Sequence, residues 1–411
     1  MSARLRVLVS AYACSPIQGS EPGMGWGFVE AISKYHDLWV MTEKEKFESE
    51  IEAELEERPQ LRDSIRFYYI LKTRHRTLRK IWPPSYYWFY KAWQKKAFTL
   101  AAKLHKEVGF DIIHQLNMVG FREPGYLWKL DAPFVWGPIG GMGILPWRFL
   151  RELGLYGFFY HLGKNAINVF QTRYSRRPRK AASKAKALIV ATPETRDAVE
   201  KTWGRESEMI CEVGAPSRIV SQYSLRKDTE PMKLVWSGLH ESRKALNLLL
   251  NALSSLPGEV KWSLDVLGQG PRTQAWRERA DKLGIARRCN FHGWVSRDKA
   301  VSVVADSHLF IITSLADLTS TVLLEALSQG IPVICLDHCG FSNVVTEDCG
   351  IKIPVESPKQ VTTDIALAIK SVWSDETYRR KLARGALQRA KDFSWDNQVK
   401  RLNRIYQRAA R

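Results

Sequence analysis

The stretch that most constrains the fold runs from Leu309 to Pro332, with the sequence LFIITSLADLTSTVLLEALSQGIP. It begins with the apolar run Leu309–Ile312, which is typical of a buried parallel strand, and continues through a polar turn. An amphipathic helix follows and ends at Gly330, a common helix terminator. A strand, a turn and a helix N-terminus in this order favour an anion, because free N–H groups and the helix dipole point at it. An ordinary βα unit with surface acids is the alternative that this stretch alone leaves open.

Short apolar runs alternate with helical patterns along the rest of the chain. In the first half we predict strands at Arg6–Ala11, Leu38–Thr42, Asp111–His114, Pro133–Gly137 and Ala187–Ala191. In the second half we predict strands at Lys233–Ser237, Trp262–Leu267, Arg288–Phe291, His308–Ile312 and Pro332–Leu336. This alternation predicts two α/β domains with doubly wound parallel sheets, whose ligands bind beyond the carboxyl ends of the strands.

The length of 411 residues exceeds one typical core, so we predict two domains, residues 1–214 and residues 231–392. The first apolar run, Val7–Val9, is too short for a signal peptide, and no window holds eighteen uninterrupted apolar residues. Six scattered cysteines suit reduced thiols. We therefore expect a cytoplasmic protein without a membrane-spanning helix.

The net charge of +19 is concentrated in two segments without acidic residues. Leu71–Phe98 and Leu153–Pro193 each contain eight Lys or Arg and no Asp or Glu. The first also carries eight aromatic residues: Trp82, Tyr86, Tyr87, Trp88, Phe89, Tyr90, Trp93 and Phe98. Cations interleaved with Trp and Tyr favour an anionic membrane surface over nucleic acid. A solvated basic face with its aromatic rings in the core remains the alternative.

Several short motifs follow one another in a characteristic order. They are a Gly-rich segment Gly19–Gly25, the strand Asp111–His114, the segment Gly238–Ala245, the turn Gly268–Pro271, the acid pair Asp317 and Glu325 with seven residues between them, the segment Glu325–Val333, the loop Cys339–Phe341, and Phe393–Trp395. Together they resemble the family-4 glycosyltransferases. The resemblance implies a GT-B fold, in which two Rossmann-like domains face a deep cleft. It also implies that residues 1–214 bind the acceptor, residues 231–392 bind the donor, and a C-terminal helix at 393–411 packs back on the first domain.

Four positions depart from the family pattern. Asp317 replaces the first Glu of the acid pair, and Leu239 replaces an Arg that contacts the diphosphate. Arg243 is a candidate substitute for that cation. Ala245 replaces a Gly, and Asn343 stands where many members have Glu. These changes leave the donor sugar open.

A glycosyltransferase must stabilise a nucleoside diphosphate as the glycosidic bond breaks, which requires cations and N–H groups already aimed at the phosphates. We expect Lys244 to supply the cation with Arg243, and backbone N–H groups around Ser320 and Thr321 to cap the phosphates. The resemblance assigns the ribose hydroxyls to Glu325 and sugar hydroxyls to Asp317. The resemblance also makes His114 a catalytic candidate that contacts the donor sugar or the reacting region. Further donor-binding candidates are Gly23, Gly25, Gly238, Gly340 and Phe341. A surface lysine, surface carboxylates and a structural histidine are the alternatives.

The resemblance implies retaining, metal-independent transfer from a UDP- or GDP-sugar, with no organic cofactor. We expect a saccharide or lipid-linked acceptor in bacterial surface polysaccharide synthesis, and peripheral attachment to the inner face of the plasma membrane. Two alternatives remain. One is a nucleotide-sugar epimerase of the same fold, and the other is a catalytically weak, basic membrane-binding module, which the changes at Leu239 and Asp317 favour.

Overall fold

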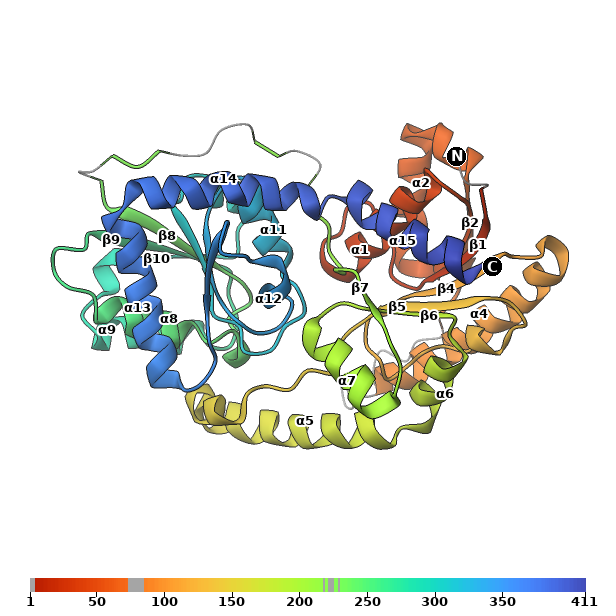
Figure 1. The fold of residues 1–411 in the computed structure, drawn as a ribbon, viewed down its shortest axis with the longest axis horizontal. Coiled ribbons are helices and arrows are strands. Elements are labelled where there is room, and N and C mark those ends of the chain that lie inside the picture. Colours follow the sequence, from red (N-terminus) through yellow and green to blue (C-terminus); the bar gives the residue numbers. More distant parts are fainter. Residues whose placement is uncertain (1–3, 73–84, 217–218, 221–224, 228–229) are drawn as a thin grey trace. The chain divides into compact units, whose positions relative to one another are not determined.

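The computed structural model describes residues 4–72, 85–216, 219–220, 225–227 and 230–411. The chain divides into two compact units, each of which surrounds one parallel sheet (Figure 1). The first unit comprises Met1–Met142, Phe170–Gly214 and Trp395–Arg411, and the second comprises Gly143–Val169 and Ala215–Ser394. Two parallel Rossmann-like sheets confirm the predicted α/β fold class.

The sheet of the first unit has seven strands in the order β3-β2-β1-β4-β5-β6-β7. Its strands are β1 (Arg6–Ala11), β2 (Asp37–Glu43), β3 (Ile65–Ile70), β4 (Ile112–Asn117), β5 (Phe134–Ile139), β6 (Ala187–Val190) and β7 (Glu208–Met209). The helices are α1 (Ser20–Ser33), α2 (Lys44–Glu57), α4 (Tyr86–Val108), α5 (Gly154–Tyr174), α6 (Arg176–Lys184), α7 (Pro193–Trp203) and α15 (Trp395–Ala409), of which α5 continues into the second unit.

The sheet of the second unit has six strands in the order β10-β9-β8-β11-β12-β13. They are β8 (Met232–Ser237), β9 (Trp262–Leu267), β10 (Cys289–Gly293), β11 (Leu309–Ile312), β12 (Val333–Leu336) and β13 (Gly350–Ile353). The helices are α8 (Leu246–Ser254), α9 (Thr273–Lys282), α10 (Arg297–Ala305), α11 (Thr321–Ser328), α12 (Phe341–Val344), α13 (Pro358–Ser374) and α14 (Glu376–Asp392). Short 3-10 turns lie at Pro59–Asp63, Leu127–Lys129, Trp147–Leu153, Ser242–Lys244 and Ala286–Arg288.

The segment Gly143–Val169 belongs to the second unit, whereas the predicted first domain, residues 1–214, contained it. The reason is packing: Phe149 and Leu153 are buried in the same apolar core as Trp236 and the leucines of α8. The C-terminal helix α15 packs on α1 within the first unit, as the resemblance implies. Its Trp395 ring leaves no room for a side chain at Gly27 or Gly214.

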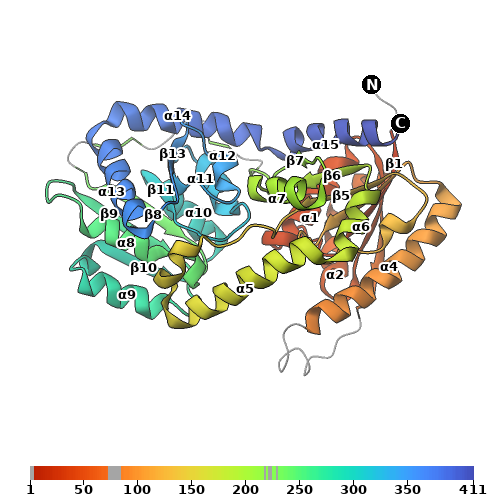
Figure 2. The same cartoon turned by 60° about the horizontal axis from the view of Figure 1, so that its bottom comes forward.

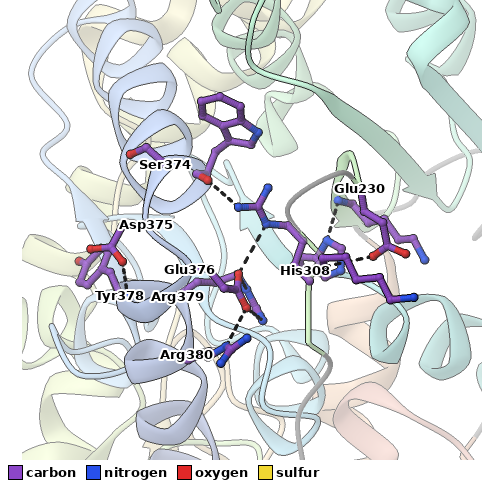
Figure 3. A network of polar contacts seen from close by, with 12 residues as sticks. Glu230, His308, Ser374, Asp375, Glu376, Tyr378, Arg379 and Arg380 are labelled. Carbon is purple, nitrogen blue, oxygen red and sulfur yellow. Dashed lines mark hydrogen bonds and ion pairs between the residues drawn. The ribbon is translucent and has the colours of Figure 1, made fainter.

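A buried arginine network holds the start of α14 in the second unit (Figure 3). Arg379 is completely buried and donates to both carboxylate oxygens of Glu376, at 2.7 and 2.8 Å. Arg226 Nε lies 3.5 Å from the same carboxylate, and its Nη2 donates to the carbonyl of Trp373 at 2.7 Å. The segment that leads into β8 is thereby tied to the junction of α13 and α14.

The aromatic residues of the first basic segment divide between core and surface. Residues 73–84, with four of its cations and Trp82, lie outside the described residues. Tyr90 and Trp93 of α4 are buried against Tyr12, whereas Tyr87 and Trp88 are exposed. Across the described ranges, no helix has both the length and the apolar character needed to span a bilayer.

Candidate functional site

The candidate site lies at the carboxyl ends of β8, β11 and β12, three neighbouring strands in the centre of the second sheet. The order of the strands reverses between β8 and β11, which is the position where open α/β sheets bind ligands. The loop after β8 carries Gly238, Arg243 and Lys244, and the loop after β11 carries Asp317. Residues far apart in the sequence therefore meet at one sheet edge.

Lys244 and Asp317 form an ion pair, with Lys244 Nζ donating to Asp317 Oδ2. Only 10% of the Lys244 side chain and 19% of the Asp317 side chain are exposed, so solvent screens this pair weakly. Arg243 Nη1 lies 3.5 Å from the other oxygen of Asp317 and donates to the carbonyl of Ala316 at 2.8 Å. Arg243 Nε also donates to Glu241 Oε2 at 2.7 Å, so two cations are balanced by two carboxylates in this cluster.

Backbone contacts hold the two loops together. Thr313 Oγ1 donates to the carbonyl of Lys244 at 2.8 Å, and the Leu315 N–H donates to the carbonyl of Arg243 at 2.8 Å. Ala245 adopts a φ of 46°, in the left-handed region where the family has a Gly. A side chain in this conformation costs about 1 kcal/mol, so the surrounding contacts must stabilise the turn.

Gly238 lies where two turns approach each other. Its N–H donates to the carbonyl of Leu267 at 3.1 Å, and a Cβ on Gly268 would collide with its carbonyl oxygen. Gly268 also has a φ of 104°, which favours glycine. The neighbouring Leu239, where the family has a cation, is 46% exposed and contributes no charge to the site.

Glu325 lies on α11, whose N-terminal residues are Ser320 and Thr321. Its side chain is 13% exposed and accepts a hydrogen bond from Arg297 Nη2 at 3.1 Å. The Ser320 side chain makes no capping hydrogen bond. Arg297 is absent from the sequence-based candidates, because nothing in the spacing connects the start of α10 with α11.

The loop after β12 closes against the loop after β11. The Gly340 N–H donates to the carbonyl of Leu318 at 3.1 Å, and a Cβ on Gly340 would collide with Thr319. Phe341 is fully buried, so its ring belongs to the core and only its backbone is available to a ligand. The Asp317 N–H donates to the sulfur of Cys339 at 3.2 Å.

Two candidates of the first unit differ from the sequence-based prediction. Gly23 and Gly25 lie inside α1 rather than in a loop before it. A Cβ on Gly25 would collide with the carbonyl oxygen of Ala13, and one on Gly23 would lie 2.5 Å from that of Gln18. These glycines allow α1 to approach the loop after β1 closely.

His114 lies in the middle of β4, and the predicted strand end at this residue is wrong because β4 continues to Asn117. Its side chain is completely buried. Nδ1 lies 2.6 Å from the Tyr406 hydroxyl, and Nε2 lies 2.6 Å from the carbonyl of Gly137. Burial lowers the pKa of His114 to about 4, so the ring is neutral near pH 7. Both nitrogens are engaged by the protein, which indicates that His114 joins α15 to the sheet and offers no atom to a donor sugar.

The part of the chain that matches a known protein family lies within the second unit. Residues 219–389 match the family model described as glycosyl transferases group 1. The lipopolysaccharide core biosynthesis glycosyltransferase LpsE of Rhizobium meliloti is 25% identical over 200 residues, which are 48% of this chain and 56% of that protein. The O-antigen chain mannosyltransferase B of Escherichia coli is 30% identical over 169 residues, 40% of this chain and 42% of that protein. The chain thus spans about half the length of these relatives.

Solved structures resemble the whole chain at low sequence identity. Sucrose-phosphate synthase from Thermosynechococcus elongatus has a TM-score of 0.64 at 14% identity, with 98% of each chain covered. HepE from Anabaena, in complex with UDP and glucose, has a TM-score of 0.61 at 14% identity, with 98% of this chain and 99% of that chain covered. These likenesses concern the fold. The family match over residues 219–389 is what confirms the resemblance to family-4 glycosyltransferases drawn from the motifs.

Proposed function

We propose that the protein transfers a sugar from a nucleoside-diphosphate sugar to a saccharide or lipid-linked acceptor, and the match of residues 219–389 to the group 1 glycosyl transferases supports this. The donor is a UDP- or GDP-sugar. The reaction proceeds with retention and without a metal, and it serves the synthesis of a bacterial surface polysaccharide. What supports this function most directly is the meeting of Lys244, Arg243 and Asp317 at the switch point of the second sheet.

In this reaction the bond between the anomeric carbon and the diphosphate oxygen breaks. The acceptor hydroxyl forms the new bond on the same face of the sugar, and its proton passes to the departing diphosphate. Negative charge grows on that leaving group, so cations held in a partly buried site lower the barrier more than they would in water. Lys244 and Arg243 supply these cations, and the N-terminus of α11 adds its dipole.

Asp317 has two tasks under this proposal. Without a donor, it neutralises Lys244, which would otherwise be a largely buried charge without an opposite partner. When the diphosphate binds, Lys244 exchanges its carboxylate partner for phosphate oxygens, and Asp317 becomes available to sugar hydroxyls. Glu325 offers two acceptor oxygens to the ribose hydroxyls and is held in place by Arg297.

Isothermal titration calorimetry with UDP and GDP tests the donor site. We expect Lys244→Ala to weaken binding of the preferred nucleotide by about 30-fold, since a charged hydrogen bond is worth about 2 kcal/mol. Glu325→Ala should weaken it by about tenfold. Lys352→Ala is the matched control, because Lys352 on β13 also pairs with an aspartate, at 3.5 Å from Asp337, which directly follows β12.

Product analysis tests the chemistry. Transfer releases the nucleoside diphosphate, whereas an epimerase would leave the sugar nucleotide intact. NMR of the product reports the configuration at the anomeric carbon, and activity after treatment with EDTA reports metal independence. If the wild type binds neither nucleotide, the transferase function is excluded. If Lys244→Ala and Glu325→Ala bind as tightly as Lys352→Ala, the site is misplaced.

We further propose that the protein lies on the inner face of the plasma membrane, as a peripheral protein in the cytoplasm. The exposed rings of Tyr87 and Trp88 on α4 support this location, because such rings favour the level of the lipid headgroups. Co-sedimentation with anionic liposomes at low salt tests it, and the absence of binding would exclude the membrane location while leaving the donor site unaffected.

A further inference from the structure

The part of α5 within the second unit, residues 154–169, has its polar side chains on the inside. Its buried face consists of Gly157, His161, Asn165 and Asn168, which recur every three or four residues. Asn165 exchanges two hydrogen bonds with the backbone of Leu145, at 2.7 and 3.1 Å. Asn168 donates to the carbonyl of Gly143 at 2.9 Å. The inner contact of this helix is therefore held by hydrogen bonds to the segment that precedes it in the chain.

The outer face of the same helix is apolar. Its exposed members are Leu155, Tyr156, Phe159, Tyr160, Leu162, Ile167 and Val169. Their exposed fractions range from 37% for Leu162 to 83% for Tyr156. The helices of water-soluble proteins normally have the opposite arrangement, with apolar residues facing the core and polar residues facing water. A contiguous exposed apolar face of this kind marks a surface that binds a partner.

The charge beside this part of α5 favours an anionic partner. Residues 154–169 contain one cation, Lys164, and no acid. A pocket of about 490 Å³ is lined by Tyr156 and Tyr160 together with Lys164, Arg243 and Arg272. Its one acid, Glu241, is paired with Arg243 at 2.7 Å. The rings at this end of α5 therefore lie beside an excess of positive charge.

We propose that residues 155–169 of α5, the helix labelled in Figure 2, bind the headgroup region of an anionic phospholipid bilayer through their outer face. Phe159 and Ile167 enter the boundary between headgroups and acyl chains, and the tyrosines lie at headgroup level with their hydroxyls in water. Lys164 and Arg272 meet lipid phosphates. This inference rests on the proposed peripheral location and names the element that provides it. Lipid phosphates are the partner that fits because Lys164, Arg243 and Arg272 outnumber the single acid Glu241 beside the tyrosines.

Co-sedimentation with vesicles tests the assignment. The full-length chain is mixed at low salt with vesicles of phosphatidylcholine alone, or with one part phosphatidylglycerol to two parts phosphatidylcholine. We expect binding to the anionic vesicles. Phe159→Ser combined with Ile167→Ser should reduce the partition coefficient by about tenfold or more, since two apolar side chains no longer leave water. Leu367→Ser is the matched control, because Leu367 is an equally exposed leucine on α13, at 59%.

A positional probe separates insertion from general adhesion. The variants Ile167→Cys and Leu367→Cys are each labelled with the environment-sensitive dye NBD. Five of the six native cysteines are buried, and labelling of the unsubstituted protein measures the background from the native thiols. We expect NBD emission to rise and shift to shorter wavelength on anionic vesicles only for the label at position 167.

The outcomes are distinct. If the wild type binds vesicles and the double variant binds equally well, α5 is not the binding element. If the wild type binds no vesicles, the membrane location fails together with this inference. If the wild type forms dimers that the double variant does not, without binding vesicles, the face joins two copies of the chain and the inference is overturned. Calorimetry with UDP and GDP on the same double variant should match the wild type, so a failure of the donor site is detected separately.

Discussion

Glu376 provides the most quantitative test of the electrostatics in the second unit (Figure 3). Burial by itself raises the pKa of this carboxyl, but hydrogen bonds and charge from Arg379 and Arg380 outweigh burial and lower the pKa from 4.5 to about 2. The folded-state pKa is below the unfolded value, so the unfolded chain binds the proton more readily. The associated stability is therefore present above about pH 4.5 and is lost as the pH falls toward about 2.

The size of the effect follows from this difference in pKa. Each pKa unit is worth about 1.4 kcal/mol, so ionised Glu376 contributes about 3 kcal/mol to the free energy of unfolding at neutral pH. Glu376→Gln keeps the shape of the side chain and removes its charge, leaving the buried Arg379 without that carboxylate. We expect the variant to be less stable by about 3 kcal/mol at pH 7. At pH 3.5 the wild type has lost about 1.4 kcal/mol of this contribution, and the difference should shrink to about half.

Urea unfolding followed by tryptophan fluorescence, at a series of pH values from 7 to 3.5, measures this difference. Glu107→Gln is the control, because Glu107 pairs with Lys103 at 3.9 Å on α4, where both side chains are more than half exposed. That change should cost less than about 0.5 kcal/mol at every pH. A Glu376→Gln effect that stays constant from pH 7 to 3.5, or equals that of Glu107→Gln, would refute the assigned pKa.

Three further changes address the site and the helices that support it. Tyr406→Phe removes the hydroxyl that contacts His114 and should cost about 1–2 kcal/mol of stability, while the affinity for UDP or GDP stays unchanged. A large loss of nucleotide affinity would show that His114 does act in the donor site. Arg297→Ala should weaken nucleotide binding about two- to fivefold, less than Glu325→Ala, because the arginine is mostly exposed; an effect equal to Glu325→Ala would show that Arg297 contacts the nucleotide itself. Gly25→Ala should lower the melting temperature by about 5 °C or more, since its methyl group meets a backbone carbonyl that cannot move freely; an unchanged melting temperature would show that α1 shifts without cost.

The strands that the sequence did not reveal have a common position. β3, β7 and β13 each form an edge of a sheet, whereas every predicted strand except β10 is internal. An internal parallel strand is covered on both faces and needs a continuous apolar run, which is visible in the sequence. An edge strand such as β3, with the sequence IRFYYI, remains half exposed and does not need one. The missed strands therefore reflect solvent exposure.

The donor-site candidates of the second unit were accessible from the sequence because they lie in the loops, or in the first turns of the helix, that follow predicted strands. The carboxyl ends of parallel strands share one sheet edge, so order along the chain predicts that Lys244, Asp317 and Glu325 approach one another. The ion pairs that these residues form could not be predicted from the sequence. The pairs of Lys244 with Asp317 and of Arg297 with Glu325 depend on side-chain directions that only the packed loops determine.

The sequence by itself determined the alternation of strands and helices, the two sheets and the sheet edge of the candidate site, because these depend on local periodicity and chain order. Tertiary structure alone decided which residues face inward. It placed Gly143–Val169 in the second unit, buried His114 beneath α15, and turned the asparagines of α5 toward the protein and its aromatic rings toward water. Amphipathic spacing defines two faces of a helix, but which face is buried depends on the hydrogen-bonding groups that its neighbours present.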